Sequence, residues 1–150
     1  MLAWQKPETI ISNEWCWNSL AKYSDIILPC TTPLERQDIM LTPRDPYVIS
    51  MSKLVEPFKE AKSDFDIFKG IAKKLDVENL FTEGRDEEDW QKWIYQETSV
   101  KSKSLKNIDF PSYQDFRKIG WFKVPPPKEN TIMLKDFRED PTQFPLSTPC

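Results

Sequence analysis

The stretch ETIISNEWCWNSLAKYSDIILP, residues 8–29, places two short apolar segments on either side of a helix-like segment. Residues 8–12 are rich in β-branched side chains, and residues 26–28 are apolar without alternation, so both are predicted strands. Residues 18–23 suit a short helix. An apolar strand indicates burial on both faces, and a helix between two strands favours parallel pairing. The sequence therefore predicts an α/β fold with parallel strands.

Further along the chain, residues 29–38 are predicted to be irregular and residues 47–50 to form another strand. The clearest helix follows Ser63, which can cap it, and two aspartates stand in its first turn. One face of this helix is an apolar stripe made of Phe68, Ile71, Ala72 and Leu75.

The second half of the chain gives a more broken pattern. Residues 85–97 and 112–119 are predicted helices, the second one stopped by Gly120. The Lys- and Ser-rich residues 100–107 are expected to be a loop, and residues 131–134 a strand. Because the tail after residue 141 shows little regular pattern, we expect the chain to be a piece of a larger protein.

Composition excludes several classes of protein. The 150 residues are 39% hydrophobic and 30% charged, with a net charge of −3, so the chain is neither a disordered acidic protein nor a membrane protein. A mildly acidic chain has no basic footprint for nucleic acid. No apolar run approaches the roughly 20 residues of a membrane span. We therefore expect no nucleic-acid partner and no membrane span.

The absence of histidine removes the commonest general base and every Ser-His or Cys-His nucleophile pair. Three scattered glycines cannot build a dinucleotide fingerprint or a P-loop. The three cysteines are odd in number and lack CxxC spacing, which favours incidental thiols over a metal site. We expect neither a catalytic residue nor a metal ligand in this chain, which is predicted to be inactive alone.

Candidate binding residues follow the two predicted strands, because parallel sheets bind ligands at the carboxyl ends of their strands. Glu14 can accept hydrogen bonds from ribose hydroxyls, Arg36 can make forked bonds to phosphate, and Asp64 can accept two N–H donors from a guanine edge. Each also has an ordinary interpretation. Glu14 can be a solvated loop acid, Arg36 a partner of Asp38, and Asp64 a helix N-terminal charge. The tryptophans are expected in a core or an interface.

Three separated stretches carry a family resemblance. Residues 24–38, SDIILPCTTPLERQD, resemble the ADIVLPATT-x-x-ERND signature of molybdopterin oxidoreductases. Residues 60–68, EAKSDFDIF, and residues 81–84, FTEG, followed by Trp90, resemble the EARSDYDIF and FTEG…W segments of one subgroup. That subgroup comprises the dimethyl sulfoxide, trimethylamine N-oxide and biotin sulfoxide reductases.

The resemblance implies a fragment of an enzyme that reduces S-oxides or N-oxides. Its cofactor would be molybdenum bis(molybdopterin guanine dinucleotide), bound together with domains absent from this chain. Residues 1–80 would be the Rossmann-like part of an incomplete three-layer guanine-dinucleotide-binding domain, and residues 81–150 a truncated, mostly helical and extended continuation. The subgroup's serine ligand to molybdenum lies upstream of the matched region. The parent protein would be periplasmic, or cytoplasmic if of the biotin sulfoxide reductase type.

Carried over by motif, Asn13, Glu14, Arg36 and Asp64 would contact the guanosine end of the cofactor. Asn13 stands where the family often has His or Ser. The expected partners are the remaining domains of the parent reductase, its S-oxide or N-oxide substrate and an electron donor. The alternative is a stand-alone, non-catalytic binding or interaction module from a split or truncated gene.

Overall fold

A computed structural model describes residue 4 and residues 6–42, 45–126 and 132–146. Five strands are present in these ranges: β1 (Ile11–Glu14), β2 (Ile26–Pro29), β3 (Asp38–Leu41), β4 (Tyr47–Met51) and β5 (Trp121–Lys123). The helices of the same ranges are α1 (Ser19–Lys22), α2 (Asp64–Lys74), α3 (Glu78–Thr82), α4 (Glu87–Lys106), α5 (Tyr113–Ile119) and α6 (Lys135–Glu139). The fold is therefore mixed α/β, as the sequence predicts.

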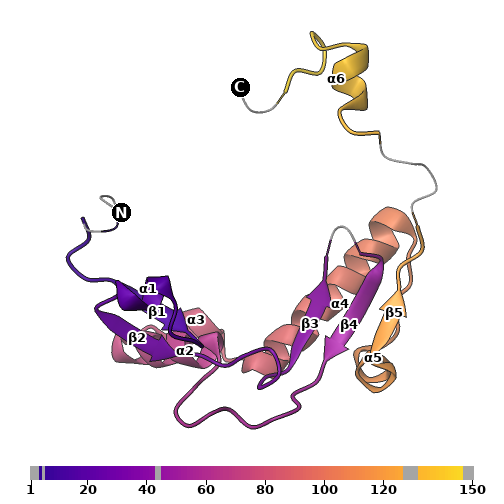
Figure 1. Ribbon diagram of the computed structural model, residues 1–150. Helices are drawn as coiled ribbons and strands as arrows, with labels where there is room; N and C mark the ends of the chain where they lie inside the picture. The colour runs from indigo at the N-terminus through magenta and orange to yellow at the C-terminus, as the bar shows by residue number, and fades with distance from the viewer. Residues whose placement is uncertain (1–3, 5, 43–44, 127–131, 147–150) are drawn as a thin grey trace.

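Strands β1 and β2 pair in parallel, in register from Ile11 opposite Ile26 to Glu14 opposite Pro29. The predicted strand–helix–strand order is thus confirmed, with α1 as its crossover helix, although the first strand begins at Ile11 and ends at Glu14 rather than spanning residues 8–12. A parallel bridge between Cys30 and Lys62 continues the pairing beyond β2. We call β1, β2 and helices α1–α3, with the loops that join them, the parallel unit (Figure 1). Its Rossmann-like assignment stays a prediction.

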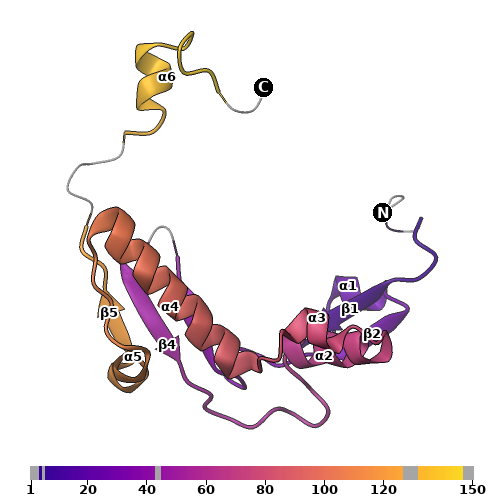
Figure 2. The same cartoon turned by 180° about the vertical axis from the view of Figure 1, so that it is seen from behind.

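Strands β3, β4 and β5 form an antiparallel sheet with β4 in the middle. Together with α4 and α5 this sheet makes the antiparallel unit, and Figure 2 shows α4 lying along the sheet. Only β4 among these strands is predicted from the sequence. Because β4 and β5 come from opposite sides of residue 80, one sheet joins both halves of the chain. The division into residues 1–80 and 81–150 stays a prediction.

The hydrophobic core lies in the antiparallel unit. Its buried members are Val48, Tyr95, Tyr113 and Phe116. Phe116 is fully buried and stacks on Tyr95, with 4.8 Å between the ring centroids. The Tyr95 hydroxyl donates a 2.8 Å hydrogen bond to the Pro111 carbonyl, which satisfies the one polar group of that ring. Burying rings of this size contributes about 1.5–3 kcal/mol each.

Helix caps form where the sequence places them. The Ser63 hydroxyl accepts a hydrogen bond from the Asp66 amide at the start of α2, and Ser112 does the same for Asp115 at the start of α5. Gly120 ends α5 with φ of 88°, a left-handed conformation that favours glycine. The apolar stripe of α2 is less buried than predicted, because only Ala72 is fully covered.

Two predictions about the second half are wrong. Residues 100–106 belong to α4 rather than to a loop, since they lack Gly and Pro and Lys is a good helix former. Asn107, in the left-handed conformation, ends that helix. The predicted strand at residues 131–134 is absent from its described part. Residues 132–134 have no strand partner and lead into α6. Residue 131 itself lies outside the described residues.

The tryptophans at the end of β1 are not core residues of this chain. Trp15 and Trp17 are 66% and 70% exposed, so their role at an interface stays a prediction. Trp90 instead packs within α4, where the Arg85 guanidinium lies 4.6 Å from its ring centroid.

Candidate functional site

The carboxyl ends of β1 and β2 lie at the same edge of the parallel sheet. Because the two strands are in register, Glu14 ends β1 directly opposite Pro29, which ends β2. The Cys30 amide then donates a 3.3 Å hydrogen bond to the Glu14 carbonyl. The loops that leave the two strands are therefore held together at this edge, as parallel geometry requires.

Backbone hydrogen bonds place the start of α2 at the same edge. The Lys62 amide donates to the Pro29 carbonyl at 3.1 Å, and the Thr31 amide donates back to the Lys62 carbonyl at 3.0 Å. Ser63 follows as the N-cap, so Asp64 stands in the first turn of α2. A carboxylate at this position is stabilised by the positive end of the helix dipole.

Three of the four predicted site residues are in contact. The Asn13 amide nitrogen Nδ2 donates to Asp64 Oδ1 at 2.9 Å. Arg36 Nη1 lies 3.8 Å from Asp64 Oδ2, and Arg36 Nη2 lies 3.1 Å from Asp38 Oδ2. These pairs are partly exposed and contribute about 0–1 kcal/mol each. We call Asn13, Arg36 and Asp64 the polar cluster.

The fourth residue, Glu14, lies beside this cluster and is held by α1. Its Oε2 atom accepts a 2.7 Å hydrogen bond from Asn18, the residue that also caps α1. The charged groups of Glu14, Asp64 and Arg36 all act on the Cys30 thiol. Burial raises the pKa of Cys30, the carboxylates of Asp64 and Glu14 raise it further, and the guanidinium of Arg36 lowers it. The four predicted residues are thus gathered around one strand end.

The loop between β2 and β3 holds Arg36 in place through Glu35. The Glu35 carboxylate accepts hydrogen bonds from the Thr32 amide at 2.7 Å, the Thr32 hydroxyl at 2.9 Å and the Phe58 amide at 2.8 Å. These donors lower the pKa of Glu35. Arg36 also forms an ion pair with Asp38, as the ordinary interpretation of this residue predicts. It contacts Asp64 at the same time.

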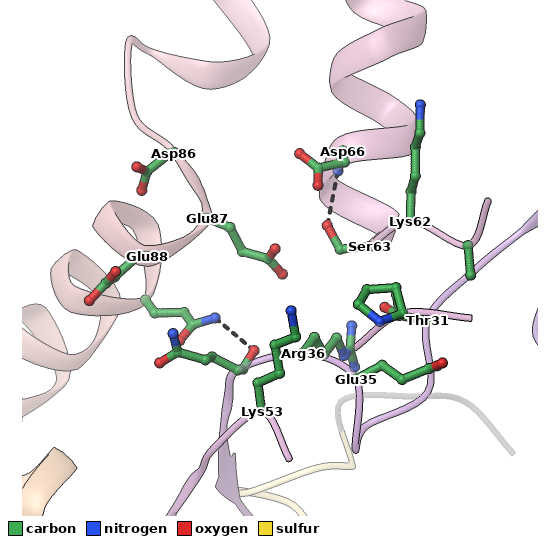
Figure 3. Close-up of a pocket in the computed structure, with 14 residues that line it drawn as sticks. Thr31, Glu35, Arg36, Lys53, Lys62, Ser63, Asp66, Asp86, Glu87 and Glu88 are labelled. Carbon is green, nitrogen blue, oxygen red and sulfur yellow. Dashed lines mark hydrogen bonds between the residues drawn. The ribbon is translucent and has the colours of Figure 1, made fainter. Parts of the chain in front are cut away.

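A cavity of about 400 Å³ lies beside Arg36, between the N-termini of α2 and α4. Figure 3 shows Glu87 extending from α4 toward Ser63, with Arg36 across the cavity. Burial raises the pKa of Glu87, and the nearby Asp66 carboxylate raises it further, whereas a hydrogen bond from Ser63 and the charge of Arg36 lower it. Glu87 thus belongs to the surroundings of Arg36.

Glu87 is the residue that sequence reasoning misses. Residues 86–89 are four consecutive acids, which at first sight only mark a helix start. Asp86 alone caps α4, by accepting from the Asp89 amide. The surplus of acid beyond what a cap requires is the one signal that could have indicated a further role.

Three polar atoms of residues that line the cavity have no hydrogen-bond partner among the described residues. They are the Thr31 hydroxyl oxygen, the Arg36 Nε atom and the Gln91 Oε1 atom. A buried polar group without a partner costs about 1–3 kcal/mol, so a ligand that satisfies these atoms gains that difference. The cavity is therefore suited to a ligand with hydrogen-bonding groups.

The described ranges contain no group of three or more His, Cys, Asp or Glu arranged to hold a metal ion. Within the same residues, no helix is both long and apolar enough to span a bilayer.

Comparison with known proteins gives a consistent set of similarities. Residues 1–74 match the family described as molybdopterin oxidoreductase. The chain is 41% identical over 150 residues to the dimethyl sulfoxide/trimethylamine N-oxide reductase of Cereibacter sphaeroides, covering 98% of this chain and 18% of that protein.

Two further relatives cover nearly the whole chain. It is 37% identical over 146 residues to the biotin sulfoxide reductase of Cereibacter sphaeroides, covering 97% of this chain and 20% of the relative. It is 35% identical over 154 residues to the trimethylamine-N-oxide reductase of Pasteurella multocida, covering 98% and 18%. The chain spans about a fifth of the length of these relatives.

Proposed function

This chain belongs to the molybdopterin oxidoreductase family, and we propose that it holds the guanosine end of a molybdopterin guanine dinucleotide in an enzyme that reduces S-oxides or N-oxides. The proposed substrate class is supported by the names of the relatives, which are reductases of dimethyl sulfoxide, trimethylamine N-oxide and biotin sulfoxide. The proposed partners are further domains, because those relatives are about five times longer.

The observation that carries the proposal is the polar cluster at the strand ends. Guanine presents two N–H donors on one edge, and the Asp64 carboxylate is the acceptor type that matches them. Arg36 supplies the cationic donors that suit phosphate or the guanine carbonyl. Asn13 and Glu14, at the end of β1, would contact the same guanosine. The orphaned hydroxyl of Thr31 beside them fits a hydrogen-bonding ligand.

The molybdenum of this cofactor supplies two-electron exchange when it is bound. The described residues of this chain offer no metal-binding cluster, so their role is to bind and orient the nucleotide end. Asp64 would fix the base edge, while Arg36, held by Glu35 and Asp38, would neutralise negative charge near it.

The first prediction tests this assignment with Asp64→Ala. Loss of the carboxylate removes the acceptor for the guanine edge, and each hydrogen bond to a charged group is worth about 1.5–3 kcal/mol. We expect the affinity for guanosine monophosphate to fall by about tenfold or more. Titration calorimetry on the purified protein measures this, together with the guanine nucleotide released from it by acid.

Glu78→Ala is the control, because Glu78 is an acid in the first turn of another helix, α3, and belongs to neither the polar cluster nor the lining of the cavity beside Arg36. It should retain nearly all of the affinity. Unchanged nucleotide content in the Asp64 variant would contradict the site assignment. A wild-type protein that binds no guanine nucleotide would contradict the proposed function and favour the stand-alone interaction module.

A further inference from the structure

The cavity beside Arg36 lies next to the polar cluster but does not include Asn13 or Asp64 in its lining. It is lined by elements of both units: the loop after β2, the start of α2 and the start of α4 (Figure 3). Arg36 lines it and also contacts Asp64. A ligand at the polar cluster can therefore extend past Arg36 into this cavity.

The cavity has unmet hydrogen-bonding capacity. Thr31 is only 7% exposed, and its hydroxyl oxygen has no partner among the described residues. The Nε atom of Arg36 is also buried and unpartnered in the described structure. Both atoms can donate a hydrogen bond, whereas the third unpartnered atom of the lining, Gln91 Oε1, is an acceptor. A ligand that both accepts and donates hydrogen bonds would satisfy all three atoms.

Glu87 provides the complementary group. It is half-buried at the first position of α4, and in Figure 3 its carboxylate reaches into the cavity. Burial raises the pKa of this carboxyl. A hydrogen bond from Ser63 engages Glu87, as one from Asn18 engages Glu14, but of these two acids only Glu87 lines the cavity. Glu87 is therefore the acid placed to accept from a ligand hydroxyl in the cavity.

The charges around the cavity select the kind of ligand. Five acids, Glu35, Asp66, Asp86, Glu87 and Glu88, line it against three basic residues, Arg36, Lys53 and Lys62. This excess of negative charge disfavours a phosphate. A pair of neighbouring hydroxyls is neutral, donates to a carboxylate and accepts from Thr31 and Arg36. A carboxylate that receives ribose hydroxyls is a common arrangement in nucleotide sites.

We propose that this cavity receives the ribose diol of the bound guanosine, with Glu87 as the acceptor and Thr31 and Arg36 as donors. The inference rests on the proposed function, because the base is taken to lie at Asp64. Arg36 then stands between two subsites, one for the base and one for the sugar. Glu87 then selects for ligands that carry both the 2′- and the 3′-hydroxyl of the ribose.

The test compares guanosine monophosphate with its 2′,3′-dideoxy analogue by titration calorimetry on the purified protein. Wild type should bind the hydroxylated nucleotide about tenfold more tightly. Glu87→Gln should weaken binding of that nucleotide by a similar factor and leave the affinity for the analogue unchanged. Asp89→Asn is the matched control, since Asp89 is an exposed acid in the same first turn of α4 and does not line the cavity.

The outcomes separate the two proposals. Retained discrimination in Glu87→Gln, with binding still lost in Asp64→Ala, would overturn the diol subsite and leave the proposed function standing. Thr31→Val gives a second readout that keeps the size of the side chain, and it should lower the same discrimination. Absence of guanine nucleotide binding in a wild-type sample that melts cooperatively would overturn both proposals.

Discussion

The two units of the molecule differ in what they bury. The antiparallel unit buries large side chains, with Val48, Tyr95, Tyr113 and Phe116 in one cluster. Among the described residues of the parallel unit, the buried apolar side chains are Ala21 and Ala72, and the others carry hydroxyls, namely Ser12, Thr31, Ser63 and Thr82. One unit is therefore organised by apolar packing, and the other by polar groups around strand ends.

This difference indicates that stability and ligand binding depend mainly on different units of the molecule. Small and hydroxylated side chains contribute little apolar burial, but they leave room and donors beside a ligand. Ring stacking around Phe116 stabilises the antiparallel unit, whose helix α4 also supplies Glu87 to the cavity. Changes in the two units should consequently have different effects, and the following predictions test that separation.

The largest effect is expected from Phe116→Ala. Removal of this fully buried ring should cost about 3–5 kcal/mol, because the cost of the residual cavity adds to the loss of apolar burial. Urea unfolding measures the change. Phe58→Ala is the control, because Phe58 is 70% exposed and should change stability by less than about 0.5 kcal/mol. A small effect of Phe116→Ala would show that the antiparallel unit is not held by its core.

A second prediction concerns alkaline pH and Tyr95. Burial raises the pKa of Tyr95 to about 12, so the folded state keeps the phenol proton longer than the unfolded state. The stabilisation is complete below pH about 10, the usual value for tyrosine, and is lost as pH rises through about 12. Wild-type stability should therefore fall over this range.

Tyr95→Phe should reduce that fall, because it removes the titrating group. At pH 7 the variant should be less stable by about 1 kcal/mol, since the Pro111 carbonyl loses its hydrogen bond. Urea unfolding at pH 7 and at several values above 10 gives both quantities. An identical alkaline decline in variant and wild type would contradict burial of this phenol.

The smallest effect on stability, and the sharpest comparison, comes from two matched caps. Ser63→Ala and Ser112→Ala each remove a serine that accepts from the amide three residues later, and each should cost about 1 kcal/mol. Only Ser63→Ala should also weaken binding of guanosine monophosphate, because it loosens the start of α2 beside Asp64. Equal binding losses in the two variants would contradict the division between units.

The sequence predicts the parallel unit better than the antiparallel one, and the reason is physical. The β1–α1–β2 connection is local, so periodicity and caps report on it directly. The antiparallel sheet depends on pairing between β4 and β5, which lie some seventy residues apart, and no local pattern encodes such a contact. For this reason β5 is absent from the prediction. β3 is also absent from it, although β3 pairs with β4 across a short connection.

The residues of the candidate site show the same difference between what the sequence predicts and what it does not. Asn13, Glu14, Arg36 and Asp64 follow from strand ends and motifs, and the structure brings them to one edge. Glu87 could not be predicted, because it reaches the cavity through the packing of α4 rather than through a neighbouring strand. An acid-rich first turn has the same appearance whether its carboxylates face solvent or a cavity.

Arg36 lies in the segment that connects β2 to β3, and hence one unit to the other. Any molecule that touches Arg36 together with Asp64 and Glu87 contacts both units simultaneously. Its binding free energy then also resists bending at this connection, so that occupancy and the angle between the units become thermodynamically linked. Tight binding would make the joint rigid, and a stiffer joint would in turn slow release of the molecule.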